Sequence, residues 1–189
     1  MTDLAAPYDD YESQLRAVRL DAEDLLKGLS SEQANWRPAT GGWSIAQCLD
    51  HLRVVDGSYV KALREGVSGA EAKGLRPDGT TPRYGFFERS FVSNMEPPAK
   101  LKLKAPKSVA PPSTLDLEEV SERFFATNRK LIDLLPAAGR VHPVRAKIRS
   151  PLARILKLSV GAAFALLAAH DRRHLWQARR VREDGSFPS

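Results

Sequence analysis

One C-terminal stretch of the chain reads Ala168-Ala169-His170-Asp171-Arg172-Arg173-His174-Leu175-Trp176-Gln177-Ala178 and carries two histidines four residues apart. On an α-helix, side chains at i and i+4 lie on one face, one turn apart. The same face continues upstream at helical spacing through apolar residues, namely Val160, Ala163, Phe164 and Leu167. Both imidazoles therefore occupy positions where a core-facing helix normally carries leucine. The stretch predicts a buried helix, with either a packed histidine pair or a metal-chelating pair.

The composition is that of one globular domain. A chain of 189 residues can bury one sizeable core and is short for two domains, so we expect a single domain over residues 1–189. The first ten residues show no signal segment, and the longest nearly uncharged stretch, 158–169, is shorter than the roughly 20 apolar residues that span a bilayer. The single cysteine, Cys48, excludes an internal disulfide and fits a reducing compartment. We expect a cytoplasmic protein with no membrane partner.

Basic residues give the chain a formal net charge of +6. Much of the excess lies in two clusters, Lys100, Lys102, Lys104 and Lys107, then Arg140, Arg145, Lys147, Arg149, Arg154 and Lys157. Such clusters can attract nucleic acid, anionic lipid or an acidic small molecule. No aromatic interleaving or DNA-binding motif accompanies them, so a solvated face is the better interpretation. We expect no nucleic-acid partner.

Four amphipathic segments are predicted to be helices, at approximately 8–29, 44–65, 114–136 and 159–182. Ser44 followed three residues later by Gln47 is a capping box ahead of an apolar run, and Pro136 with Gly139 marks the end of the third segment. No segment shows a convincing alternating strand pattern; the connector 140–157 is expected to be extended in part. These features predict an all-α fold, a four-helix bundle with long crossover connections.

A long irregular segment, 66–113, separates the second and third helices. Prolines recur through it, so no long helix can run there. Within it, 84–92 is predicted to form a short helix whose aromatic residues cap one end of the core. Long loops in compact domains are usually functional or mobile. We interpret this segment as a lid or a subunit contact.

Two sequence blocks resemble the signatures of the DinB/YfiT-like superfamily. The first is Trp36-x-Pro38, then Gly41-Gly42-Trp43-Ser44-Ile45-Ala46-Gln47 leading into His51-Leu52; the second is His170-Asp171-Arg172-Arg173-His174-Leu175-x-Gln177. The similarity covers nearly the whole chain in element order. It implies a metal-binding four-helix bundle, often dimeric, whose ion is held by one histidine of the second helix and two of the fourth. Carried onto this sequence, the metal ligands are His51, His170 and His174.

The residues themselves agree with this ligand set. Three of the four histidines fall on inward-looking faces of two separate helices, whereas exposed positions are commoner for polar residues. Three imidazoles bind zinc at about 2.0–2.1 Å and leave coordination positions open for water or substrate. Nitrogen ligation suits several divalent transition metals. We expect zinc or nickel, with iron, manganese and copper as further candidates.

Some residues near the histidines allow more than one interpretation. Cys48, one turn before His51, is a fourth ligand, a reactive thiol or, the better interpretation, a small buried core residue. Gln177, one turn past His174, either assists the reaction by binding substrate or a metal-bound water, or makes a hydrogen bond that contributes only to helix packing. His142 is expected to be a loop residue.

Charged and aromatic residues beside the histidines also have alternatives. Asp50 and Asp171 either orient an imidazole or are solvated helix charges. Trp43 either walls the cleft or packs against the helix start. Arg172 and Arg173 are expected beside the apolar stripe, in salt bridges or facing an anionic substrate.

The resemblance also bears on function. Characterised relatives include S-transferases and an isomerase that depend on low-molecular-weight bacterial thiols such as bacillithiol and mycothiol, which implies a metal-dependent transferase acting on a small molecule. A thiol coordinated to the metal would lose its proton and attack an electrophile. One alternative is a hydrolase using a metal-bound water, which the lack of a glutamate on the histidine face disfavours. The other is a non-catalytic, metal-binding stress or interaction protein that forms a homodimer.

Overall fold

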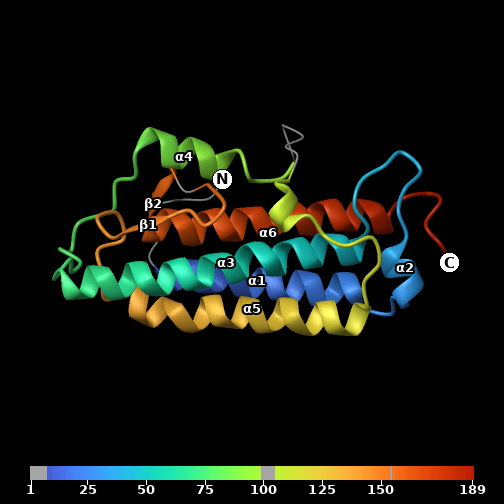
Figure 1. Ribbon diagram of the computed structural model, residues 1–189, viewed down its shortest axis with the longest axis horizontal. Helices are drawn as coiled ribbons and strands as arrows, with labels where there is room; N and C mark the ends of the chain where they lie inside the picture. The colour runs from blue at the N-terminus through green and yellow to red at the C-terminus, as the bar shows by residue number, and fades with distance from the viewer. Residues whose placement is uncertain (1–7, 99–104, 154) are drawn as a thin grey trace.

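The structure is a computed structural model that describes residues 8–98, 105–153 and 155–189. Within these ranges four long helices lie along the long axis of the molecule (Figure 1): α1 (Tyr8–Leu26), α3 (Ile45–Ala72), α5 (Leu117–Ala138) and α6 (Val160–Arg182). α1 and α3 each contact both α5 and α6, so the four helices close into a bundle. The predicted all-α four-helix bundle with long crossover connections is confirmed.

The connections carry the shorter elements. They are α2 (Ser31–Asn35), α4 (Phe86–Ser93), the 3-10 turn η1 (Lys107–Val109), and the antiparallel strands β1 (Lys147–Arg149) and β2 (Lys157–Ser159). The connector 140–157 is extended in part, as expected, whereas the pairing of β1 with β2 was not predicted. Strands of three residues are too short to show an alternating pattern in the sequence.

α3 begins where its capping box predicts. The Ser44 hydroxyl accepts a hydrogen bond from the Gln47 amide at 3.2 Å, and the Gln47 side chain accepts one from the Ser44 amide at 3.1 Å. The helix continues to Ala72 rather than ending near 65. Gly66, which we took as the start of the irregular segment, is a packing residue, because a Cβ there would collide with the Ile148 side chain. A glycine inside a helix can thus mark close approach instead of an end.

The boundaries of two other helices also differ from the prediction. α1 ends at Leu26, three residues before the predicted end. α5 begins at Leu117, capped by the Asp116 carboxylate, which accepts from the Glu119 amide at 2.8 Å. It runs through Pro136 to Ala138. Because Pro136 lies in the last turn, its missing N–H costs only one hydrogen bond near the helix end.

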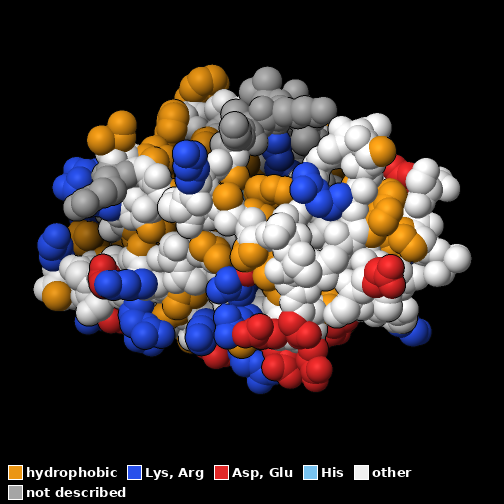
Figure 2. Space-filling model, turned by 45° about the vertical axis from the view of Figure 1, so that its right-hand side comes forward, with side chains coloured by type: hydrophobic (Ala, Val, Ile, Leu, Met, Phe, Trp, Pro, Cys, Tyr) orange, Lys and Arg blue, Asp and Glu red, His pale blue; other side chains and the backbone are white. Residues whose placement is uncertain are grey.

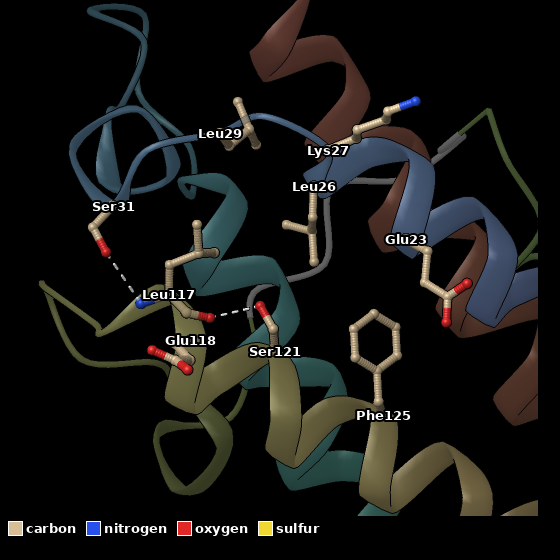
Figure 3. A pocket seen from close by; sticks show the side chains of 9 residues that line it. All are labelled: Glu23, Leu26, Lys27, Leu29, Ser31, Leu117, Glu118, Ser121 and Phe125. Carbon is tan, nitrogen blue, oxygen red and sulfur yellow. Dashed lines mark hydrogen bonds between the residues drawn. The ribbon is translucent and has the colours of Figure 1, made fainter.

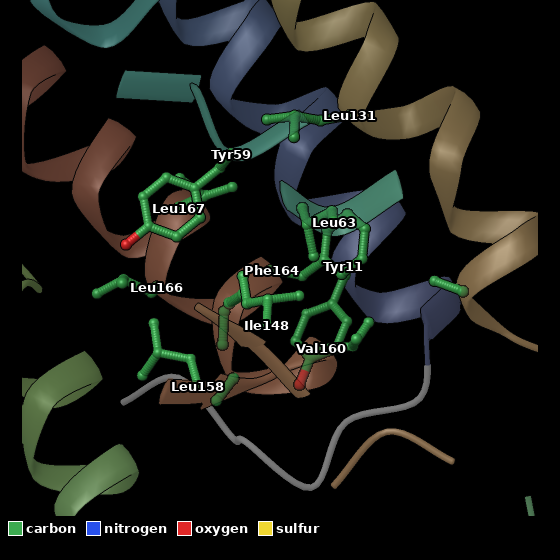
Figure 4. Packing of buried hydrophobic residues seen from close by; sticks show 14 of the residues in the cluster. Tyr11, Tyr59, Leu63, Leu131, Ile148, Leu158, Val160, Phe164, Leu166 and Leu167 are labelled. Atoms are coloured by element: carbon green, nitrogen blue, oxygen red, sulfur yellow. The ribbon is translucent and has the colours of Figure 1, made fainter. Parts of the chain in front are cut away.

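The buried side chains form a core that runs along the bundle. Figure 4 shows the part around Tyr11 on α1 and Phe164 on α6, whose rings are stacked with centroids 6.3 Å apart. A second cluster surrounds the start of α3 and includes Cys48 and Leu49. No helix among the described residues is both long and apolar enough to cross a membrane.

The short helix predicted for 84–92 is present as α4, over the start of α6 (Figure 1). Its Glu88 carboxylate accepts a hydrogen bond from the Ser159 amide at 2.7 Å and so ties α4 to the beginning of α6. Tyr84 is buried, but Phe86 and Phe87 are 79% and 57% exposed. The prediction that the aromatic residues of this segment cap the core is therefore wrong for these two.

Candidate metal centre

Three histidines from two antiparallel helices meet near the middle of the bundle. His51 extends from α3, and His170 and His174 extend from successive turns of α6. One nitrogen from each lies within 4.8 Å of the other two, and the Nε2 atoms of His51 and His170 are 3.3 Å apart. The structure brings together the three side chains that the sequence singled out.

Hydrogen bonds set the proton position on two of the rings. Nδ1 of His51 lies 2.8 Å from the carbonyl oxygen of Val109, and Nδ1 of His174 lies 3.1 Å from Oε1 of Gln177. Both oxygens accept hydrogen bonds, so each Nδ1 carries the proton and each Nε2 keeps its lone pair. Metal-ligating histidines usually donate their other N–H to an oxygen in this way. Gln177 therefore contacts His174 through its side-chain oxygen.

Burial keeps the three rings neutral. Loss of solvation lowers the pKa of His170 well below its ordinary value, and the neighbouring His174, His51 and Arg173 lower it further. Burial, with His51 and Arg173, lowers the pKa of His174 to about 3, and burial also lowers that of His51. Neutral imidazole is the form that binds a metal ion.

The arrangement fits a divalent ion. Two nitrogens that bind one zinc ion tetrahedrally, each at about 2.0–2.1 Å, stand roughly 3.3–3.4 Å apart. The Nε2 atoms of His51 and His170 are already separated by 3.3 Å. The Nδ1 atom of His170 is buried and has no hydrogen-bond partner among the described residues. A three-nitrogen site with open positions is what this donor set can form.

Trp43 forms an aromatic wall beside the histidines. Its ring centroid lies 4.7 Å from that of His51 and 5.6 Å from that of His174, and it is stacked on His174 with an interplanar angle of 26°. The indole therefore shields one side of the site and leaves it apolar. This contact favours the interpretation of Trp43 as a cleft wall.

Neither aspartate near the histidines orients an imidazole. The Asp50 carboxylate pairs with Arg53 at 2.5 Å. Asp171 is fully buried and interacts electrostatically with Asp56 on α3, and burial raises the pKa of both carboxyls well above the ordinary value. No hydrogen-bond partner for either carboxyl is found among the described residues. Asp171 is thus neither a solvated helix charge nor an imidazole partner, and Asp56 was missed because nothing local in the sequence relates it to Asp171.

The remaining predicted residues have structural roles. Cys48 is fully buried in the core, and burial raises the pKa of its thiol to about 12, so the core interpretation holds. His142 is a loop residue, as predicted, and its Nδ1 accepts hydrogen bonds from the amides of Val144 and Arg145.

Two arginines of α6 form hydrogen bonds to the segment that follows α4. Arg172 makes two hydrogen bonds to the Glu96 carboxylate, at 2.6 and 3.0 Å, and Arg173 donates to the carbonyl oxygen of Asn94 at 3.0 Å. The salt-bridge interpretation therefore holds for Arg172. Both residues join the segment after α4 to the helix that carries His170 and His174.

Two cavities among the described residues lie away from the histidines. One of about 510 Å³ lies between the end of α1 and the start of α5 (Figure 3), lined by Glu23, Leu26, Lys27, Leu29, Ser31, Leu117, Glu118, Ser121 and Phe125. Another, of about 680 Å³, is bordered by α2 and by the chain leading into α5. Neither presents a set of groups suited to nucleophilic or acid–base chemistry.

On the face shown in Figure 2, Lys and Arg side chains are interspersed with acidic and apolar ones. Lys100, Lys102 and Lys104 of the first cluster, and Arg154 of the second, lie outside the described residues. The absence of a nucleic-acid partner stays a prediction.

Comparison with known proteins identifies a matching family model and a similar protein. A family model described as the DinB superfamily matches residues 14–178. The uncharacterized protein YuaE of Bacillus subtilis (strain 168) is 26% identical over 166 residues, which cover 88% of this chain and 93% of that protein. No solved structure matches the chain.

Proposed function

Because the chain belongs to the DinB superfamily and three neutral histidines converge inside its bundle, we propose that it binds a divalent transition metal and uses it to transfer a thiol to an electrophilic small molecule. The observation that carries the proposal is the 3.3 Å separation of the His51 and His170 Nε2 atoms, with both the His51 and His174 protons held on Nδ1. The imidazoles of His51 and His174 therefore already have the tautomer that metal ligation requires.

The proposed reaction joins a low-molecular-weight thiol to an electrophile that carries a leaving group. A carbon–sulfur bond forms, the bond to the leaving group breaks, and the thiol proton departs with the leaving group. A bound divalent ion would supply Lewis acidity, which lowers the pKa of a coordinated thiol or water. Trp43 would exclude water from one side, and Val109 and Gln177 would hold two of the imidazoles in the ligating tautomer.

The carboxylates of the protein favour a thiol over water as the nucleophile. In the described part of the chain, the metal-binding group contains three histidines and no aspartate or glutamate. The neighbouring Asp50 is paired with Arg53, and Asp171 is buried beside Asp56, where burial favours the protonated form of both carboxyls. Hydrolysis by an activated water commonly relies on a carboxylate base, as in His-Glu-x-x-His enzymes. A thiol nucleophile would not depend on such a base, because a divalent ion held by the three histidines would lower its pKa.

We propose zinc or nickel as the metal. We also propose that the protein is cytoplasmic and that it forms a homodimer. The metal follows from ligation by nitrogen alone and from a donor spacing suited to tetrahedral binding. The compartment and the dimer follow from the single buried cysteine and from the family resemblance. Elemental analysis of untagged protein and sedimentation analysis test the metal and the dimer, and a monomer at micromolar concentration would contradict the assembly.

Thiol-transfer assays on metal-loaded, untagged protein test the function. Glutathione, cysteine, bacillithiol and mycothiol would each be offered with monochlorobimane, whose fluorescence rises on thiol addition. We expect turnover with at least one thiol, and loss of both turnover and metal in His51→Ala and His170→Ala. His142→Asn is the matched control, because Asn can accept the same backbone hydrogen bonds as His142 Nδ1; it should keep both.

Other results would support the alternatives. Cleavage of a model ester without any thiol would indicate a hydrolase. Metal binding with no turnover of any thiol or ester would indicate a non-catalytic binding protein.

A further inference from the structure

A short segment before α5 is attached to the metal centre and to α2 at regular intervals. The backbone of residues 109–115, here called the arm, is bonded by a side chain at every third residue. His51 lies 2.8 Å from the Val109 carbonyl, Gln47 donates to the Pro112 carbonyl at 2.8 Å, and Asn35 pairs with Leu115. All three contacts join residues at least 58 positions apart in sequence.

The two α3 contacts come from one face of the helix. Gln47 and His51 are four residues apart, so their side chains lie one turn from each other. Gln47 is buried and uses both ends of its amide, the oxygen in the capping box and the nitrogen on the Pro112 carbonyl. The first turn of α3 therefore holds the arm beside the histidine that the arm orients.

Asn35 makes the contact farthest from the histidines. Its Nδ2 donates to the Leu115 carbonyl at 2.7 Å and its Oδ1 accepts from the Leu115 amide at 2.9 Å. This two-way bond mimics a backbone pair and fixes both the position and the orientation of Leu115. Asn35 and Leu115 both border the 680 Å³ cavity.

The first half of the arm is conformationally restricted. Pro111 and Pro112 have their φ angles fixed by their rings, and Ala110 is extended, with φ −76° and ψ 129°. Extended proline-rich chain resists bending over several residues. The chain then bends at Ser113 and Thr114, so Leu115 is joined to this constrained part through two residues.

We propose that the arm is part of the metal centre and that Asn35 and Gln47 are positioning residues for it. By holding the arm, they keep the Val109 carbonyl where it accepts the Nδ1 proton of His51, so that Nε2 of His51 faces His170. The inference rests on the proposed metal binding. Since coupling between two binding events is reciprocal, a metal at the histidines must in turn stabilise the docked arm.

Zinc affinity of Asn35→Ala tests the proposal. Asn35 is half-buried and touches no histidine, yet the variant should bind Zn²⁺ at least about fivefold more weakly, measured by competition with a chromophoric chelator. Asn35→Asp, which can still accept from the Leu115 amide, should recover part of the affinity. Hydrogen exchange of residues 105–116 in the wild type should slow when Zn²⁺ is added, and this slowing should be smaller in Asn35→Ala.

Asn128→Ala is the matched control. Asn128 is also an asparagine that links distant elements, donating to the Leu15 carbonyl at 3.1 Å, but this bond joins α5 to α1 and not the arm. The control should lower the free energy of unfolding and leave zinc affinity unchanged. Wild-type zinc affinity in Asn35→Ala, equal weakening in Asn128→Ala, or unchanged exchange of the arm on zinc addition would each overturn the proposal while leaving the metal site intact. Failure of the wild type to bind any divalent metal would instead overturn the metal site, and the arm's role with it.

Discussion

Among single residues, His174 shows how burial and protonation are linked to stability. Its pKa in the folded chain is about 3, whereas an unfolded histidine has a pKa near 6.5. Between these values the unfolded chain binds a proton that the folded chain does not, so stability falls as the pH falls. We expect metal-free wild type to lose about 1–2 kcal/mol relative to His174→Gln between pH 7 and pH 5.

Denaturant unfolding of both proteins at several pH values measures this difference. Comparing the two chains cancels most of the opposing contribution of Asp56 and Asp171. Their raised pKa values stabilise the fold below the unfolded carboxyl pKa and lose that effect as the pH rises. A stability difference independent of pH would show that His174 has the same pKa in the folded and the unfolded chain.

Cys48 illustrates a reactive group made inert by its surroundings. The side chain is fully buried, and at a pKa of about 12 only roughly one thiol in ten thousand is ionised at pH 8. We expect the native protein to react with Ellman's reagent more than about a thousandfold more slowly than the protein unfolded in guanidinium chloride. Rapid labelling of the native chain would mean that this part of the core opens readily.

For the helices, the two capping boxes provide a comparison within one chain. Ser44 caps the 28-residue helix that carries His51, and its side chain is fully buried. Ser30 makes the same two bonds at the start of the exposed, five-residue α2. We expect Ser44→Ala to lower the free energy of unfolding by about 1–2 kcal/mol and Ser30→Ala by about 0.5 kcal/mol. Urea titrations measure both, and a larger loss for Ser30→Ala would contradict this assignment.

The existence of each long helix was predictable from apolar spacing, but several ends were not. The start of α3 was correct because a capping box is closed between residues three apart in sequence. The prediction that a loop begins at Gly66 is wrong. A glycine is needed there because Ile148, more than eighty residues away in the chain, packs against that position. Short strands and the exposure of Phe86 and Phe87 likewise depend on what packs against them.

At the level of the whole molecule, metal binding should stabilise the fold. A ligand that binds only the folded chain adds about 2.7 kcal/mol at a hundredfold excess over Kd. For a protein of this size that corresponds to a rise in Tm of roughly 5–10 °C. Thermal unfolding with and without Zn²⁺ measures it, chelation should reverse it, and His51→Ala should show no shift. An equal shift in that variant would place the zinc elsewhere.

The sequence alone determined the bundle and the three histidines. Both are carried by local rules, since helical periodicity puts His170 and His174 on one face and the capping box sets the register of α3 with His51 on it. The family resemblance then joined the two blocks. These features require only neighbours within a few residues, which is why they can be read from the order of amino acids.

Only the tertiary structure decided what surrounds those histidines. The partner of His51 is the backbone carbonyl of Val109, 58 residues away, and the arm is held by Asn35, 80 residues from Leu115. Every residue has a carbonyl, so such a contact leaves no trace in the choice of amino acid. The proximity of Asp56 and Asp171 likewise cannot be predicted from the sequence. It arises from the packing of α3 against α6, which are far apart in the chain, and not from any local pattern.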